Sequence, residues 1–348
     1  MRSAASPPAS ARARPRNTRR SRSRITCNRC IGKPMSAEAV LLVHGAWQGA
    51  WAWERLVPLL TARGLTVIAV DLPGNGADGH DPATVTLEAC LDHLDACAAP
   101  FERVSVVGHS GGGLIASAWA ERCTKVARLA YVAGMMLPAQ TSFAEVQAMT
   151  AGECETGHGI TPHLTWSPDR RVSQVPAVAA QAIFFNDCPS QTAREASARL
   201  TPQGDGARAI RLTSVTRIRA LPRLYIEATE DLSLPLAVQR RMQALMPGAL
   251  VAAVPTGHVP QLSAPQLLAD QLIPFLTGAR DDEARRMRRE PCPAARIARA
   301  LTPVSPLDPT AARIGHDTNG ENDENTRHLA CFGQPHCDGR CGPSGGQR

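Results

Sequence analysis

Short apolar runs alternate with stretches of helical periodicity along the middle of the chain. The apolar runs predict buried β-strands at residues 40–43, 65–70, 104–107, 126–132, 223–227 and 250–254. Apolar residues spaced three and four apart predict helices at residues 51–63, 87–94, 114–122, 236–246 and 267–276. This alternation predicts an α/β fold with an open, mostly parallel sheet and helices on both faces. Since crossovers are right-handed, the carboxyl ends of the strands should lie along one edge.

Residues 137–216 break this alternation. Glycines and prolines are scattered through them, and an apolar run occupies residues 177–186. A long irregular insertion between regular β/α units predicts a cap over the functional edge rather than more sheet. We therefore take Trp166, Phe184 and Phe185 as candidates for lining a substrate pocket, with ordinary core packing as the alternative.

The strand predicted at residues 104–107 runs directly into a G-x-S-x-G motif centred on Ser110. This motif, after a strand and before a helix, is typical of a serine held on a tight strand-to-helix turn. The turn leaves no room for side chains on its flanks, which fits glycine at Gly108 and Gly112. It also lifts the hydroxyl above the sheet, so we predict that Ser110 is a nucleophile.

A serine hydroxyl needs a general base, and the base needs a carboxylate to orient it. His258 follows the last predicted strand, and an imidazole with a pKa of about 6.5 can take and return a proton. Two carboxylates, Glu230 and Asp231, follow the preceding predicted strand. We favour Asp231 because the residues after it are typical of a turn. The resulting chain order of serine, acid and histidine fits strands that end on one edge.

Other polar residues near these strand ends have different predicted roles. The backbone N–H groups of Ala46 and Gly111 are the expected donors to an oxyanion. His44 and His109 are expected to satisfy buried backbone groups. Residues 74–79 match the G-x-G-x-x-G pattern after a strand, but they do not open a helix, which argues against a dinucleotide site.

The positive charge of the chain lies at its ends. The formal net charge is +7, but residues 1–35 carry +10 and residues 279–348 carry +1, which leaves −4 for residues 36–278. Composition predicts that both ends are disordered extensions of one folded domain at residues 36–278. Because the positive charge lies outside this domain, we expect no nucleic-acid partner for it.

Three interpretations of the basic N-terminal segment remain open. It is upstream sequence before a start at Met35, which we favour, or a transit-like leader, or an arm that binds polyanions. No apolar run reaches the roughly 18 to 20 residues of a membrane-spanning helix, and no apolar segment follows the arginines as in a secretory signal. We therefore expect a soluble, cytoplasmic protein with no membrane partner.

The eleven cysteines indicate free thiols rather than a disulfide framework. Five lie in the middle of the chain, and an odd number in helical patterns is typical of buried thiols in a reducing compartment. The ends lack two close cysteine pairs at zinc-ribbon spacing. We expect neither a metal nor an organic cofactor. The residues of this weak metal pattern are Cys27, Cys30, Cys331, His336, Cys337 and Cys341.

Five segments in order resemble the α/β-hydrolase superfamily, specifically the branch of plant methylesterases, hydroxynitrile lyases and related bacterial esterases. They are HGAWQGAW, DLPGNG, GHSGGG, YIEATEDLSLP and GHVPQLSAPQLLA. The resemblance implies a catalytic triad of Ser110, Asp231 and His258, with Ala46 and Gly111 as oxyanion amides. It also implies a small-molecule ester as the substrate.

Three departures from the branch bear on the reaction. The lyases that the chain resembles carry Thr and Lys where it has Gly45 and Val259, and those side chains handle the hydroxyl and cyanide groups. Many relatives also carry a bulky residue where this chain has Gly111, which predicts a roomier pocket. We therefore expect a serine hydrolase of small carboxylic esters. A lyase on the same scaffold and a non-catalytic small-molecule sensor remain the alternatives.

Overall fold

The computed structural model describes residues 37–153, 159–204 and 210–279. The predicted extensions, the interpretations of the basic segment and the weak metal pattern of the two ends lie outside the described residues. Within the described residues, no helix is long and apolar enough to cross a membrane.

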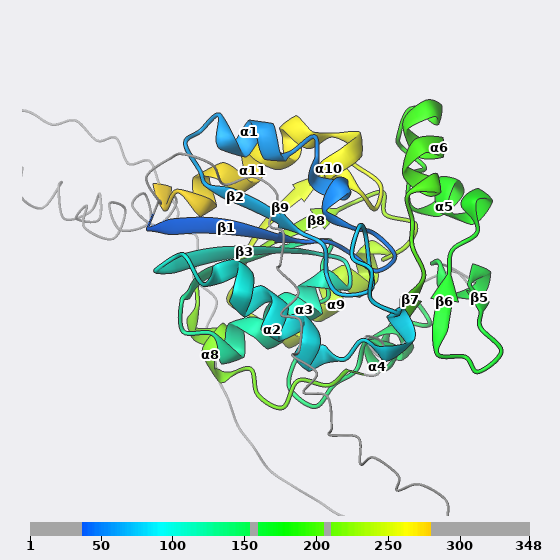
Figure 1. The fold of residues 1–348 in the computed structure, drawn as a ribbon, viewed down its shortest axis with the longest axis horizontal. Helices are drawn as coiled ribbons and strands as arrows, with labels where there is room; N and C mark the ends of the chain where they lie inside the picture. The colour runs from blue at the N-terminus through cyan, green and yellow to red at the C-terminus, as the bar shows by residue number, and fades with distance from the viewer. Residues whose placement is uncertain (1–36, 154–158, 205–209, 280–348) are drawn as a thin grey trace, which may run out of the picture. The chain divides into compact units, whose positions relative to one another are not determined.

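A single open sheet forms the centre of the fold (Figure 1). Its strand order is β2-β1-β3-β4-β8-β9, and every neighbouring pair is parallel. This confirms the predicted α/β architecture. The strands are β1 Glu38–Val43, β2 Val67–Val70, β3 Arg103–His109, β4 Val126–Val132, β8 Arg223–Ala228 and β9 Leu250–Val254.

Helices cover both faces of this sheet, so β1 is apolar on both sides. In β1, Leu41 and Val43 pack into one core cluster while Val40 and Leu42 pack into the other. Figure 1 shows α1 and α11 on one face and α2, α3, α8 and α9 on the other. Their bounds are α1 Val57–Thr61, α2 Leu87–Ala98, α3 Gly112–Arg122, α8 Thr216–Ala220, α9 Leu236–Leu245 and α11 Pro265–Leu276.

The helix predicted at residues 51–63 is wrong as a continuous element. A 3₁₀ turn at Ala50–Trp53 is followed by the separate short helix α1. Pro58 lies in the first turn of α1, where its missing N–H costs nothing. The same proline inside one long helix would remove a backbone hydrogen bond, so the chain restarts the helix instead.

Residues 137–216 contain short helices and a small separate sheet. The three strands pair antiparallel in the order β5-β6-β7, which the sequence pattern did not predict. None of them joins the central sheet. Figure 1 shows these elements beside the core, with α5 and α6 next to β5–β7. Their bounds are α4 Phe143–Met149, β5 Thr165–Trp166, β6 Val172–Gln174, α5 Ala177–Ile183, α6 Ser190–Ala198 and β7 Gln203–Gly204.

Candidate active site

Ser110 lies on the sharp turn between β3 and α3. Its φ of 49° is in the left-handed region that residues other than glycine rarely adopt. Hydrogen bonds on both sides of the residue hold this backbone. The N–H of Ser110 donates to the oxygen of Val132 (3.2 Å), and its own carbonyl oxygen accepts from the N–H of Met135 (2.8 Å) and of Gly113 (3.0 Å). Neighbouring β4 and the loop after it therefore fix the serine in place.

The glycines beside Ser110 are required by close contacts. A Cβ atom on Gly108 would lie 2.7 Å from the Cα atom of Gly113, and one on Gly112 would overlap the carbonyl oxygen of His44. The strand β1 and the helix α3 thus approach each other through the backbone of the turn. This agrees with the steric reason for the motif.

Replacing Gly112 with alanine should destabilise the fold. The added methyl group has to displace backbone atoms, so we expect the free energy of unfolding to fall by about 2–3 kcal/mol. Urea unfolding measures this change. Gly79→Ala is the matched control, because a Cβ atom there meets nothing within 4 Å and should change stability by less than about 0.5 kcal/mol. Equal losses in the two variants would contradict the packing argument.

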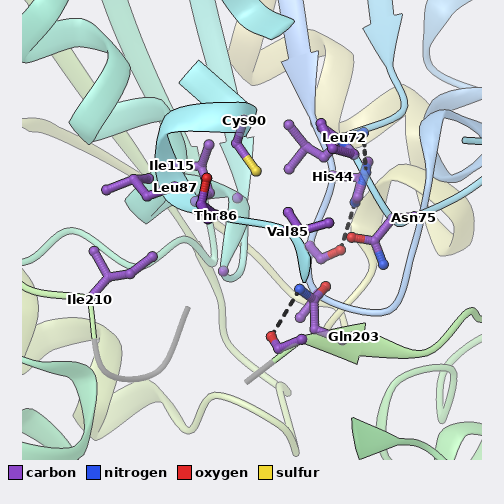
Figure 2. Close-up of a pocket in the computed structure, with 16 residues that line it drawn as sticks. His44, Leu72, Asn75, Val85, Thr86, Leu87, Cys90, Ile115, Gln203 and Ile210 are labelled. Atoms are coloured by element: carbon purple, nitrogen blue, oxygen red, sulfur yellow. Dashed lines mark hydrogen bonds between the residues drawn. The ribbon is translucent and has the colours of Figure 1, made fainter. Parts of the chain in front are cut away.

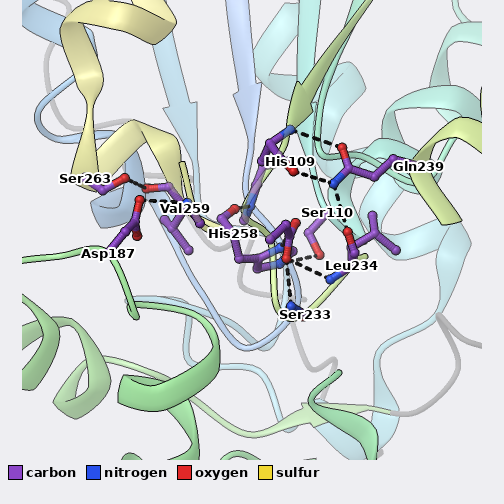
Figure 3. Close-up of polar contacts among 12 residues, drawn as sticks. His109, Ser110, Asp187, Ser233, Leu234, Gln239, His258, Val259 and Ser263 are labelled. Atoms are coloured by element: carbon purple, nitrogen blue, oxygen red, sulfur yellow. Dashed lines mark hydrogen bonds and ion pairs between the residues drawn. The ribbon is translucent and has the colours of Figure 1, made fainter. Parts of the chain in front are cut away.

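A series of hydrogen bonds joins Ser110 to His258 and Asp231 (Figure 3). The Nε2 atom of His258 is 3.1 Å from Oγ of Ser110, and its Nδ1 atom is 2.7 Å from Oδ2 of Asp231. The other oxygen of Asp231 accepts from the backbone N–H groups of Ser233 (2.7 Å) and Leu234 (2.8 Å). With Nδ1 donating to the carboxylate, Nε2 is left as the acceptor that faces the serine hydroxyl. The three predicted residues are therefore adjacent and correctly ordered for proton transfer.

Glu230, the alternative acid, points elsewhere. Its side chain is exposed, and its backbone N–H donates to the oxygen of Thr256 (3.0 Å). The side chain of Asp231, by contrast, is fully buried against the His258 imidazole. Among the two carboxylates, only Asp231 contacts the histidine.

The two residues predicted to bind an oxyanion have adjacent backbones. A Cβ atom on Gly111 would lie 3.7 Å from the backbone nitrogen of Ala46. Neither N–H takes part in the loop and turn hydrogen bonds of the described residues. Gly111 also stands at the amino end of α3, where backbone N–H groups lack intrahelical partners. Both amides are therefore free to donate beside Ser110.

His44 and His109 are buried and bonded to backbone. In His44, Nδ1 donates to the oxygen of Gly45 (2.8 Å) and Nε2 accepts from the N–H of Leu72 (3.1 Å). In His109, Nε2 donates to the carbonyl oxygen of His258 (2.8 Å). Burial lowers the pKa of His44 and lowers that of His109 well below its usual value, so both rings stay neutral. His109 thus supports the loop that carries His258.

A small cavity of about 60 Å³ opens next to Ser110 and Gly111. Trp47, which the sequence reasoning did not select, is fixed there in a left-handed conformation with a φ of 63°. Its indole Nε1 donates to Oγ of Ser173 (3.2 Å), and its carbonyl oxygen accepts from the N–H of Thr201 (2.8 Å). The apolar part of the lining consists of Ala46, Trp47, Met135, Phe143, Ile160 and Leu234.

The three aromatic pocket candidates are not among the described residues that line this cavity. Phe184 stacks on the His258 ring with centroids 5.2 Å apart, and Phe185 packs edge-on against Phe184. The guanidinium of Arg170 lies over the Trp166 ring, with its Cζ atom 4.9 Å from the ring centroid. Phe184 and Phe185 are core, which was the alternative considered for them, because the insertion needs an apolar centre of its own.

Asp187 is a further residue that the sequence reasoning missed. It follows α5, and its Oδ2 atom accepts from the N–H of Gly257 (2.7 Å), the residue before His258. Its other carboxylate oxygen is buried without a hydrogen-bond partner among the described residues. No local motif marks Asp187, because its contact joins positions 70 residues apart. The inserted segment therefore holds the histidine loop directly.

In the part of the chain that the structure describes, no group of three or more His, Cys, Asp or Glu residues is arranged to hold a metal ion. At Ser110, the serine hydroxyl can form a covalent bond with a substrate, and the hydrogen-bonded histidine can accept its proton.

The chain is similar in sequence and in fold to known hydrolases. Residues 40–271 match the sequence model of the alpha/beta hydrolase family. The chain is 29% identical over 257 residues to a pyrethroid hydrolase of Sphingobium wenxiniae, covering 69% of this chain and 88% of that protein. It is 28% identical to pheophorbidase of Raphanus sativus, covering 67% and 92%. The crystal structure of a pyrethroid hydrolase from Sphingobium faniae superposes with a TM-score of 0.63 at 28% identity, covering 70% of this chain and 99% of that one.

Proposed function

Because the chain belongs to the alpha/beta hydrolase family, we propose that it is a serine hydrolase that cleaves small carboxylic esters through an acyl-enzyme. The observation that carries this proposal is the continuous hydrogen bonding from Ser110 through His258 to Asp231. Relatives named pyrethroid hydrolase and methylesterase support an ester as the substrate.

In the proposed mechanism, the Oγ atom of Ser110 attacks the ester carbonyl carbon while Nε2 of His258 takes the hydroxyl proton. The N–H groups of Ala46 and Gly111 donate to the oxyanion of the tetrahedral intermediate. His258 then gives its proton to the alcohol oxygen, the carbon–oxygen bond breaks, and the acyl group remains on Ser110. Water then attacks the acyl carbon while His258 takes its proton, the bond to Oγ of Ser110 breaks, and His258 returns the proton to Oγ as the acid leaves. Asp231 keeps the imidazole oriented through both halves.

Two positions argue for hydrolysis over lyase chemistry. A side chain at Gly45 would meet Nδ1 of His109 at 2.8 Å and Cβ of Ser110 at 3.0 Å, so the turn has no room for a hydroxyl-bearing residue without a shift. Val259 is fully buried in an apolar cluster with Phe184 and Trp47. Neither position can supply the hydroxyl or ammonium group expected of the lyases.

A panel of p-nitrophenyl and methyl aryl esters tests the proposed function, with Ser110→Ala protein as the blank. We expect the purified chain to release acid and alcohol in equal amounts. Cyanide release from a cyanohydrin without ester cleavage would instead indicate a lyase. Binding of esters without any turnover would indicate a sensor.

The Asp187 carboxylate should position His258 for the reaction. Removing it in Asp187→Ala frees the N–H of Gly257, and we expect kcat to fall by about tenfold with little change in KM, because substrate contacts are retained. Asp187→Asn keeps an oxygen acceptor and should recover most of the rate. The measurement is steady-state kinetics with melting temperatures in parallel. A loss that appears only in KM, or equally in both variants, would contradict the positioning role.

A further inference from the structure

A second cavity, of about 140 Å³, lies beside the small cavity at Ser110. The two share four lining residues, which form the boundary between them: Ala46, Gly111, Gln203 and Gly204. Figure 2 shows Leu87, Cys90 and Ile115 on one side of the second cavity, and His44, Leu72 and Asn75 on the other. The cavity therefore lies between the start of α2 and the loops after β1 and β2.

The boundary is open at Gly111. Apart from its chain neighbours, a Cβ atom at this position would meet only Ala46, at 3.7 Å. A longer side chain would project into the space that both cavities border. The absence of a side chain therefore leaves room at this boundary for a ligand that reaches from one cavity toward the other.

The walls of the second cavity are mainly apolar and uncharged. Side chains of Leu72, Val85, Leu87 and Ile115 contribute to them, and none of the described lining residues is Asp, Glu, Lys or Arg. Burial raises the pKa of the Cys90 thiol to about 11, so this residue is also neutral at physiological pH. A charged ligand group would find no counter-ion among the described residues that line this cavity.

The polar side chains of the walls already have partners within the protein. Both ring nitrogens of His44 are bonded to backbone. The amide of Asn75 donates to Oγ1 of Thr201 (3.2 Å), and Oε1 of Gln203 accepts from the N–H of Trp47 (3.3 Å). The Oγ1 atom of Thr86 likewise accepts from the N–H of Ala89 (3.2 Å). These bonded atoms place no demand on a ligand. The cavity thus fits a hydrocarbon group.

The two cavities differ in volume. An apolar cavity of about 150 Å³ accommodates a benzene molecule, so the second cavity has room for a phenyl ring or a chain of about five carbons. The cavity at Ser110, with about 60 Å³, holds only a smaller group. We propose that the second cavity binds the acyl group of the ester, and that this group is uncharged and apolar with about six carbons. This inference rests on the proposed esterase function.

The direction of proton transfer assigns the acyl half to this cavity. The alcohol oxygen must leave next to Nε2 of His258, which supplies its proton. Neither Ser110 nor His258 lines the second cavity, whereas Ala46 and Gly111 do. With the carbonyl oxygen held at those amides and the alcohol oxygen at Nε2 of His258, the acyl chain is the remaining substituent, and the second cavity borders the amides and not the histidine.

Filling the second cavity should remove the preference for longer acyl groups. We expect the wild-type protein to have a higher kcat/KM for p-nitrophenyl hexanoate than for p-nitrophenyl acetate. Cys90→Phe should lower the ratio of these two values by at least about tenfold, because one missing methylene in an apolar pocket is already worth that much. Ala89→Phe adds the same ring to the exposed side of α2 and should leave the ratio within about twofold.

A second variant keeps the test possible if the first does not fold. Val85 is half-buried at the start of α2, and Val85→Phe should lower the same ratio if Cys90→Phe does not fold by circular dichroism. An unchanged ratio in folded cavity variants would overturn the inference. So would a response confined to the alcohol series of methyl and hexyl acetate. If the wild-type protein cleaves none of these esters and Ser110 does not react with a fluorophosphonate, the proposed function itself fails and the inference falls with it.

Discussion

Ser110→Ala protein is expected to lose roughly 10⁴- to 10⁶-fold in kcat for a p-nitrophenyl ester, with its fold intact. The variant lacks the Oγ atom that forms the proposed acyl-enzyme, so the residual rate should be that of water held near the oxyanion amides. Initial rates with and without enzyme measure the loss. Ser190→Ala, at the start of α6, removes an exposed hydroxyl that lines neither cavity and should stay within about twofold of wild type.

The same loss should follow from removing the base, and the two losses should not add. His258→Ala leaves the Ser110 hydroxyl without a proton acceptor, because Nε2 at 3.1 Å is its partner. Residues that act as one unit give non-additive effects, so the double variant should be slower than either single variant by less than about tenfold. A fall of less than tenfold in either single variant would refute its assigned role.

Asp231→Asn is expected to lower kcat by about 10⁴-fold, since an amide in place of the carboxylate favours the wrong imidazole tautomer. The backbone N–H groups of Ser233 and Leu234 still hold the remaining oxygen, which should preserve the loop. Glu230→Gln is the matched control, because its exposed side chain makes no contact with the imidazole. If only the second variant is inactive, the acid has been assigned to the wrong residue.

The main strands could be predicted because each contains a run of apolar residues, and β1, β4 and β8 are also largely buried. The predictions for β4 and β9 match the observed bounds, Val126–Val132 and Leu250–Val254. The small sheet was missed because β5 and β7 have two residues each, too few to show a period. The prediction of one helix at residues 51–63 failed because it used apolar spacing alone. It did not take into account that Pro58 favours the start of a new helix.

The residues of the candidate site were predictable where they follow a predicted strand. Ser110, Asp231 and His258 each come directly after an apolar run, so topology alone brings them to one edge. Asp187 and the cavity lining were not predictable in this way. Their contacts depend on where a long insertion packs against the central domain, and local sequence does not encode that path. The domain limits and the cytoplasmic compartment stay predictions.

Covalent labelling with a fluorophosphonate probe tests the central claim most directly. Intact-mass measurement of folded protein should show one added label, and peptide mapping should locate it on Ser110. Both the label and the ester hydrolysis should be absent from Ser110→Ala protein. Folded wild-type protein that takes up no label, or equal labelling of wild-type and Ser110→Ala protein, would contradict the account.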